Sequence, residues 1–148
     1  MIKPLQAPPG FEARTRDSFA RQAAMATLGI TLDRVEAGTV HLLLPHRADL
    51  TQQYGFLHAG IVSTALDSAC GYAAFTLMPA DAAVLTIEFK VNLLAPARGP
   101  VLRVAGQVVK AGRTISVVDA RATQGDDDTL VATMTATVMT VLGRGLSG

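Results

Sequence analysis

The hydrophobic and polar positions of the chain follow two different periods. Residues 58–78 are apolar or small at nearly every position, which is typical of a helix buried on most sides. From Val84 to Leu93 the pattern alternates strictly and predicts a strand with one dry face, formed by Leu85, Ile87, Phe89, Val91 and Leu93. Turn-forming segments separate three more predicted strands, at residues 101–110, 114–123 and 130–141.

Upstream of the long helix the pattern is simpler. Residues 12–28 predict one amphipathic helix stopped by Gly29, and residues 30–44 predict a strand pair that turns at residues 36–38. We expect the last four strands to form a meander of antiparallel hairpins. The sequence therefore predicts an α+β fold in which one curled antiparallel sheet wraps around a long central helix. An edge strand of such a sheet would invite a second copy of the chain.

Length and composition indicate one ordinary domain spanning residues 1–148, with residues 1–10 and 143–148 expected to be loose. The chain is 49% hydrophobic and 17% charged with a net charge of +1, which gives no electrostatic reason to expect nucleic acid or a membrane surface as a partner. A single cysteine, Cys70, excludes an internal disulfide framework. The proline-broken start does not resemble a signal peptide, so we expect a cytoplasmic protein.

One acidic residue, Asp67, lies at the middle of the most apolar segment. Its position argues against a membrane span, and the flanks of the segment lack cationic anchors. Because an unpaired carboxylate is costly to bury, Asp67 is a candidate for a chemical role. The structural alternative is a helix acid that is hydrogen-bonded to Ser63 or Ser68 or that faces a polar subunit interface.

A resemblance becomes visible over residues 50–141. The run Gln52-Gln-Tyr-Gly-Phe-Leu-His58-Ala-Gly60, with Asp67 nine residues after the histidine, is similar to the motif of the hotdog-fold acyl-CoA thioesterases of the PaaI-like group. The segments Val84 to Pro96 and Gly112-Arg-Thr114 fit the same family. Two positions depart from its pattern, because Ala59 replaces a glycine and Thr86 stands where some relatives carry serine.

Thioester hydrolysis needs a nucleophile or general base and donors to the developing oxyanion. Asp67 is the candidate for the first role, and the N–H groups of Ala59 and Gly60 at the helix start are candidates for the second. The resemblance implies that Gln52 binds the acyl carbonyl or orients water and that His58 holds the helix start and the region of the thioester sulfur. It also implies a supporting hydroxyl at Thr86 and substrate contacts from Tyr54, Gly55, Phe56, Arg113 and Thr114.

Helix geometry gives a sharper expectation. Nine residues of α-helix correspond to about 13 Å of rise and about half a turn of net rotation. Asp67 and the start of its own helix therefore point apart and cannot reach one thioester. We expect a homodimer with two shared sites, in which Asp67 of one copy faces Gln52, His58 and Ala59 of the other; a dimer of dimers is left open.

Other interpretations of the same residues stay open. His58 could be an ordinary helix cap, Gln52 a loop residue, Thr86 a β-forming residue, Arg113 an exposed turn residue and Cys70 core filling. No motif predicts a metal or a bound cofactor. The rival functions are a hotdog hydratase or dehydratase and an acyl-CoA sensor without turnover. The acyl group, and whether Asp67 attacks directly or through water, are not determined by the sequence.

Overall fold

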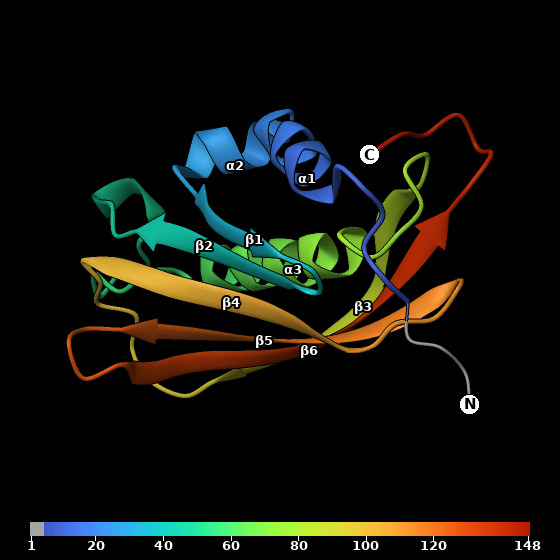
Figure 1. The fold of residues 1–148 in the computed structure, drawn as a ribbon. Helices are drawn as coiled ribbons and strands as arrows, with labels where there is room; N and C mark the ends of the chain where they lie inside the picture. The colour runs from blue at the N-terminus through green and yellow to red at the C-terminus, as the bar shows by residue number, and fades with distance from the viewer. Residues whose placement is uncertain (1–4) are drawn as a thin grey trace.

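The computed structural model describes residues 5–148 and contains one six-stranded antiparallel sheet in the order β1-β2-β4-β5-β6-β3 (Figure 1). The helices are α1 (Phe11–Ala20), α2 (Ala23–Leu28), the 3-10 turn Ala48–Leu50 and α3 (Ala59–Phe75). The strands are β1 (Thr31–Glu36), β2 (Thr39–Pro45), β3 (Ala83–Leu93), β4 (Val101–Lys110), β5 (Ile115–Gln124) and β6 (Thr129–Val141). In this part of the chain no helix is long and apolar enough to cross a bilayer.

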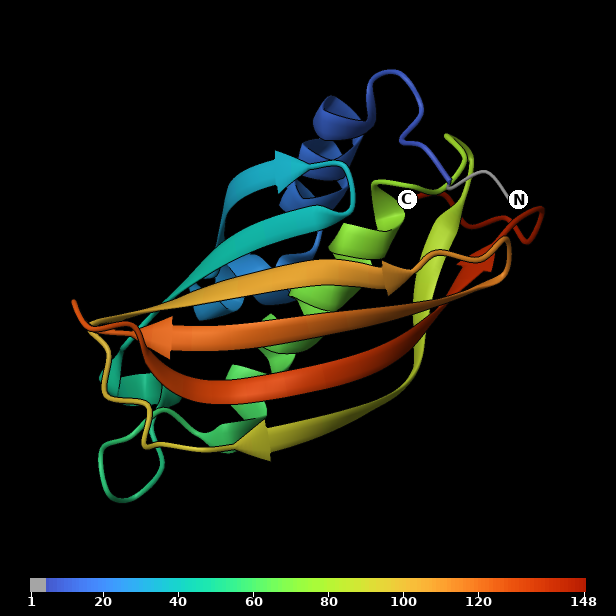
Figure 2. The same ribbon diagram turned by 60° about the horizontal axis from the view of Figure 1, so that its bottom comes forward.

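The long helix α3 packs across one face of the curved sheet and contacts β2 through β6 (Figures 1 and 2). Ala65, Ala69 and Ala73 are fully buried and keep its sheet-facing side narrow. The backbone of α3 comes so close to β4 that a Cβ at Gly106 would lie 2.4 Å from the carbonyl oxygen of Ala69. Only glycine permits this approach. The predicted α+β architecture, a curled sheet around a central helix, is confirmed.

The N-terminal helical segment is not one helix, as the sequence predicted, but two. Gln22 adopts extended backbone angles (φ −81°, ψ 96°) and separates α1 from α2. In a continuous helix Phe19 and Met25 would point about 120° apart, because six residues make one and two-thirds turns. The break lets both side chains enter the same core.

The predicted meander is correct only for β4, β5 and β6. β3 pairs with β6 at the edge of the sheet and not with β4, its neighbour in sequence. The connection of residues 94–100 makes this order feasible. Three strand spacings amount to about 14 Å, and seven extended residues can span more than 20 Å.

The prediction that the alternating apolar residues of β3 form one dry face is also wrong. A β-bulge at Ile87, between Thr86 and Glu88, shifts the register of β3 against β6. Leu85 therefore lies opposite Met139 on the outer face, whereas Phe89 lies opposite Ala136 on the face that carries α3. Apolar side chains of β3 remain about half exposed in the protomer: Leu85 51%, Ile87 53%, Phe89 47% and Leu93 53%.

Arg14 ties α1 to the end of α3. Its guanidinium donates to the carbonyl oxygens of Pro79 at 2.7 Å and Phe75 at 2.8 Å and lies over the Phe75 ring. The Phe75 carbonyl is at the end of α3 and that of Pro79 lies just beyond it, where helix acceptors lack intrahelical partners and a cation is favourable. Burial lowers the pKa of Arg14 from its ordinary value. The N-terminal helix thus acts as a cap on the central one.

The two ends predicted to be loose differ in what the structure describes. Residues 142–148 contain no helix or strand, and the Gly148 N–H donates to the carbonyl oxygen of Ala82. Residues 1–4 of the N-terminal segment lie outside the described residues.

Candidate active site

Asp67 is half-buried on the face of α3 that looks toward the edge strand β3. Thr86 donates a hydrogen bond to its Oδ1 at 2.8 Å. The bulge at Ile87 explains this contact, because it places Thr86 on the same face as Phe89 and not with Glu88 and Lys90. Thr86 thus holds one carboxylate oxygen, and no hydrogen bond to the other oxygen is formed within residues 5–148.

The structural alternative for Asp67, a bond to Ser63 or Ser68, is not what the structure contains. Ser63 donates to the carbonyl oxygen of Ala59 at 2.8 Å, and Ser68 donates to Gln22 at 3.5 Å. One turn after Asp67, a Cβ at Gly71 would meet no atom within 4 Å beyond its own helix. Asp67 therefore has both a free acceptor oxygen and open space near it.

The start of α3 is capped by His58, which is one of the two roles that the sequence left open for it. His58 Nδ1 accepts a hydrogen bond from the Gly60 N–H at 2.8 Å, so the neutral ring carries its proton on Nε2. The Gly60 amide is consequently occupied, and of the two candidate oxyanion donors only the Ala59 N–H is left without an acceptor within residues 5–148. Ala59 is exposed, so a ligand can reach it.

Gln52 borders the same cavity as Ala59. Its Oε1 accepts from the Tyr54 N–H at 2.5 Å and the Phe56 N–H at 3.4 Å, which leaves the Nε2 donors free. A cavity of about 360 Å³ opens here, and its walls are Gln52, Phe56, Leu57, Ala59, Val62, Leu93, Leu94, Ala95, Pro96, Ala97 and Val131. Two N–H donors, from Gln52 and Ala59, thus border one largely apolar cavity, which is the composition of a small-molecule site.

Two of the predicted substrate contacts near Gln52 lie in the loop that follows it. Gly55 has a positive φ of 84° and its carbonyl oxygen contacts His46 Nε2, while the Tyr54 side chain is 74% exposed. Within the protomer neither residue borders the cavity, whereas Phe56 does.

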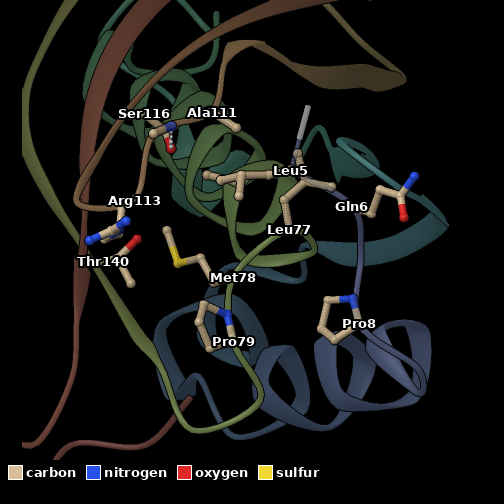
Figure 3. Close-up of a pocket in the computed structure, with 12 residues that line it drawn as sticks. Leu5, Gln6, Pro8, Leu77, Met78, Pro79, Ala111, Arg113, Ser116 and Thr140 are labelled. Atoms are coloured by element: carbon tan, nitrogen blue, oxygen red, sulfur yellow. Dashed lines mark hydrogen bonds between the residues drawn. The ribbon is translucent and has the colours of Figure 1, made fainter. Parts of the chain in front are cut away.

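Arg113 and Thr114 lie at the other end of the sheet, in the turn between β4 and β5. Arg113 borders a second cavity of about 220 Å³ between the N-terminal segment and the end of α3 (Figure 3). Met78 and Thr140 lie next to Arg113, and Leu5 and Leu77 form the apolar wall (Figure 3). The structure does not bring this cavity together with Gln52 in one protomer.

The predicted catalytic residues therefore form two separate groups in one protomer. Ala59, at the first position of α3, and Asp67 are eight residues apart, which is about 12 Å of helix rise. Gln52 and His58 stand with Ala59, while Thr86 stands with Asp67. A small acyl group cannot touch both groups of the same chain.

Cys70 is close to Asp67 in sequence but is core filling, as expected. Its side chain is fully buried and its thiol faces the carbonyl oxygen of Val118 at 3.8 Å. Burial raises the pKa of Cys70 to about 12, and the negative charge of Asp67 acts in the same direction. The thiol stays protonated at neutral pH and is a poor nucleophile.

The loop that forms part of the Gln52 cavity, and the residue that holds this loop, were not predicted from the sequence. Pro96 and Ala97 border the cavity, and Arg98 lies over the Phe56 ring at 4.8 Å. Gln124 is buried and hydrogen-bonded to the loop. A signal was present, because Gln124 continues the inward-facing positions Ser116, Val118, Ala120 and Ala122 and is far more polar than most of them.

Comparison with known proteins agrees with this geometry. Residues 54–131 match the model of the thioesterase superfamily, and the chain belongs to that superfamily. A thioesterase family protein from Silicibacter pomeroyi is 56% identical, with a TM-score of 0.88 over 90% of this chain and 100% of that chain. The PaaI protein of E. coli, from the phenylacetic acid degradation operon, is 18% identical with a TM-score of 0.82 over 90% of this chain and 94% of that chain, and shows the shared hotdog fold.

Relatives with similar sequences are described as esterases. A proposed esterase from Halobacterium salinarum is 33% identical over 64% of this chain and 66% of that protein. Another from Saccharolobus solfataricus is 34% identical over 62% of this chain and 65% of that protein. The aligned part thus spans about two thirds of the length of these relatives.

The protonated, buried thiol of Cys70 gives a first prediction. In the native protein at pH 7 to 8, Cys70 should react with a disulfide reagent at least about 100-fold more slowly than a free thiol and at the free-thiol rate after unfolding. The reaction is followed by absorbance with and without guanidinium. The Cys70→Ala variant should retain thioesterase activity, and rapid native labelling would contradict a sealed core position.

Proposed function

We propose that this protein hydrolyses acyl-CoA thioesters to a free acid and coenzyme A. The observation that supports this most strongly is the pair of half-sites on one helix: the Asp67 carboxylate held by Thr86, and the free Ala59 amide beside Gln52. Membership of the thioesterase superfamily agrees with it. The groups present are those that acyl transfer requires.

In the proposed reaction the thioester carbonyl oxygen accepts hydrogen bonds from the Ala59 N–H and from Gln52 Nε2. These donors and the positive end of the α3 dipole stabilise the negative charge of the tetrahedral intermediate. Asp67 either attacks the carbonyl carbon or removes a proton from the attacking water. If Asp67 attacks directly, breaking the C–S bond leaves an acyl–Asp67 anhydride, which water then hydrolyses to the free acid, while the departing thiolate takes a proton from water. If Asp67 activates water, breaking the C–S bond gives the free acid at once, and the proton that Asp67 removed from water passes to the departing sulfur. His58, which caps the helix start, is proposed to lie near this sulfur.

The complete site is proposed to need two copies of the chain. Asp67 faces the unpaired edge of β3, whose exposed apolar side chains include Ile87, Phe89 and Leu93. An open strand edge with apolar side chains is a surface for a second sheet. Antiparallel pairing of two β3 strands would also set the α3 helices antiparallel, so that Asp67 of one copy approaches Ala59 of the other. The row Leu85, Ile115 and Met139 on the outer face offers a separate surface for a dimer of dimers.

The coenzyme is proposed to reach Arg113 and Thr114. Arg113 lies past the C-terminal end of α3, which in an antiparallel pair of helices is the end nearest the partner's Ala59 half-site. Its guanidinium has no ion-pair partner within residues 5–148 and borders the cavity of Figure 3. An unpaired guanidinium is a suitable group for a phosphate. The acyl group itself is left open among aromatic, short-chain and medium-chain classes.

The first functional prediction concerns Asp67. Across a panel of aromatic, short-chain and medium-chain acyl-CoA esters, the protein should release free thiol without changing chain unsaturation. Asp67→Asn should lower kcat by about 10²- to 10⁴-fold because the nucleophile or base is lost, while acyl-CoA binding persists. Altered unsaturation without thiol release would indicate a hydratase, and binding without turnover in the unmutated protein would indicate a sensor.

The shared site gives a second functional prediction. Asp67→Ala and Gln52→Ala chains should each be nearly inactive as pure proteins. Mixed after unfolding and refolded together, they should recover about a quarter of the wild-type activity, because half of the randomly assorted dimers contain one intact site. Each variant refolded alone is the control. Absence of recovery, with heterodimers demonstrated by mass spectrometry, would contradict a site built from two chains.

Arg113 is tested by removing the nucleotide from the substrate. Arg113→Gln should raise KM for an acyl-CoA about tenfold and leave kcat nearly unchanged, since a phosphate contact made throughout the reaction affects binding alone. The same variant should leave KM for the corresponding acyl-pantetheine unchanged. Arg144→Gln, an exposed cation in the C-terminal tail, serves as the matched control. Equal effects on both substrates would contradict the phosphate role.

A further inference from the structure

Gln124, the last residue of β5, makes all of its side-chain hydrogen bonds to the loop of residues 94–100. It is 8% exposed. Its Oε1 accepts from the Arg98 N–H at 2.8 Å and the Gly99 N–H at 3.0 Å, and its Nε2 donates to the carbonyl oxygen of Pro96 at 2.9 Å. One amide side chain thus supplies both a donor and an acceptor to three backbone groups of this loop, none of which pairs with a strand.

The loop that Gln124 holds is itself bonded to the segment leading into α3. The carbonyl oxygen of Ala97 accepts from the Leu57 N–H at 3.0 Å, directly before the cap residue His58. Pro96 and Ala97 also line the cavity that Gln52 and Ala59 border. Gln124 is therefore linked to the helix start through the loop: it bonds Pro96 and Arg98 on either side of Ala97, Ala97 bonds Leu57, and Leu57 precedes Ala59 by two residues in the chain.

We propose that Gln124 is a positioning residue for the oxyanion donors, an inference that rests on the proposed thioesterase function. It touches no substrate and acts by fixing the loop that sets the place of Leu57, and with it the direction of the Ala59 N–H and the distance to Gln52. Donors that stabilise a transition state are effective only when they are held in place, and a displacement of about 1 Å can cost about 100-fold in rate.

The chemistry of the side chain explains why a glutamine is needed. A methionine of similar length would leave the Arg98 and Gly99 N–H groups and the Pro96 carbonyl without partners. An ionised glutamate would keep the acceptor but lose the donor to Pro96. A protonated glutamate would restore one donor and one acceptor.

The test compares Gln124→Met and Gln124→Glu with Thr76→Val. Thr76 is the matched control because it is also a buried side chain that bonds a loop, accepting from the Gly38 N–H at 2.8 Å and donating to Ala73 at 2.7 Å, but at the far end of α3. Gln124→Met should lower kcat about 10- to 100-fold with KM changed by less than about threefold. Thr76→Val should leave kcat within about twofold of wild type.

Gln124→Glu adds a pH readout that a merely structural role would not produce. Its kcat relative to wild type at the same pH should rise as the pH is lowered and the carboxyl gains its proton. If Gln124→Met does not fold, Gln124→Glu decides the question. A kcat within about twofold of wild type at neutral pH in folded variants would overturn the proposal.

Amide hydrogen exchange separates this inference from the proposed function. In Gln124→Met, or in Gln124→Glu if the first does not fold, exchange in residues 57–60 should be faster than in wild type, and in Thr76→Val it should not change. If the wild-type protein hydrolyses no thioester, the proposed function fails while the exchange result still tests the link from Gln124 to the helix start. Unchanged exchange in residues 57–60 would overturn the positioning role by itself.

Discussion

The contact between Thr86 and Asp67 depends on one extra residue in an edge strand. Without the bulge at Ile87, Thr86 would point to the outer face of the sheet with Glu88, and the carboxylate on α3 would have no partner from the sheet. Bulges commonly redirect a side chain beside a functional site. The bulge also separates Leu85, which lies on the outer face, from Phe89, which lies on the inner face with Thr86; past the bulge the outer face carries the polar side chains of Glu88 and Lys90.

The second constraint is the stiffness of α3. Gly106 of β4 lies against the backbone of α3 at Ala69, and buried alanines line the contact, so the helix is packed closely against the sheet, while its own rise per residue sets the distance from its start to Asp67. A carboxylate and an amide donor about 12 Å apart on one helix cannot both touch a small acyl group of the same chain, and this is why the proposed site includes a second copy. The open edge of β3 lies on the same side as the acid, where such a copy would have to approach.

Much of the fold and part of the candidate site could be predicted from the sequence, and the features that could not be predicted share physical causes. The long helix, the strand bounds and the cap at His58 follow from local patterns. The bulge does not, because Leu85, Ile87 and Phe89 alternate in residue type straight through it. The pairing of β3 with β6 depends on contacts between residues far apart in the chain, which periodicity does not report. Gln124 was detectable only as a polar residue on an inward-facing position whose partners lie in a loop.

The edge position of β3 and the cavity beside Ala59 follow from the same topology. If β3 paired with β4, a short hairpin would join them and no long loop would be needed. Because β3 lies beyond β6, residues 94–100 must cross the end of the sheet, and they do so next to the start of α3. The crossing leaves backbone groups that no strand can satisfy, and Gln124 satisfies three of them. The strand order, with β3 beyond β6, thus has two consequences: β3 becomes the edge strand beside Asp67, and residues 94–100 line the cavity beside Ala59.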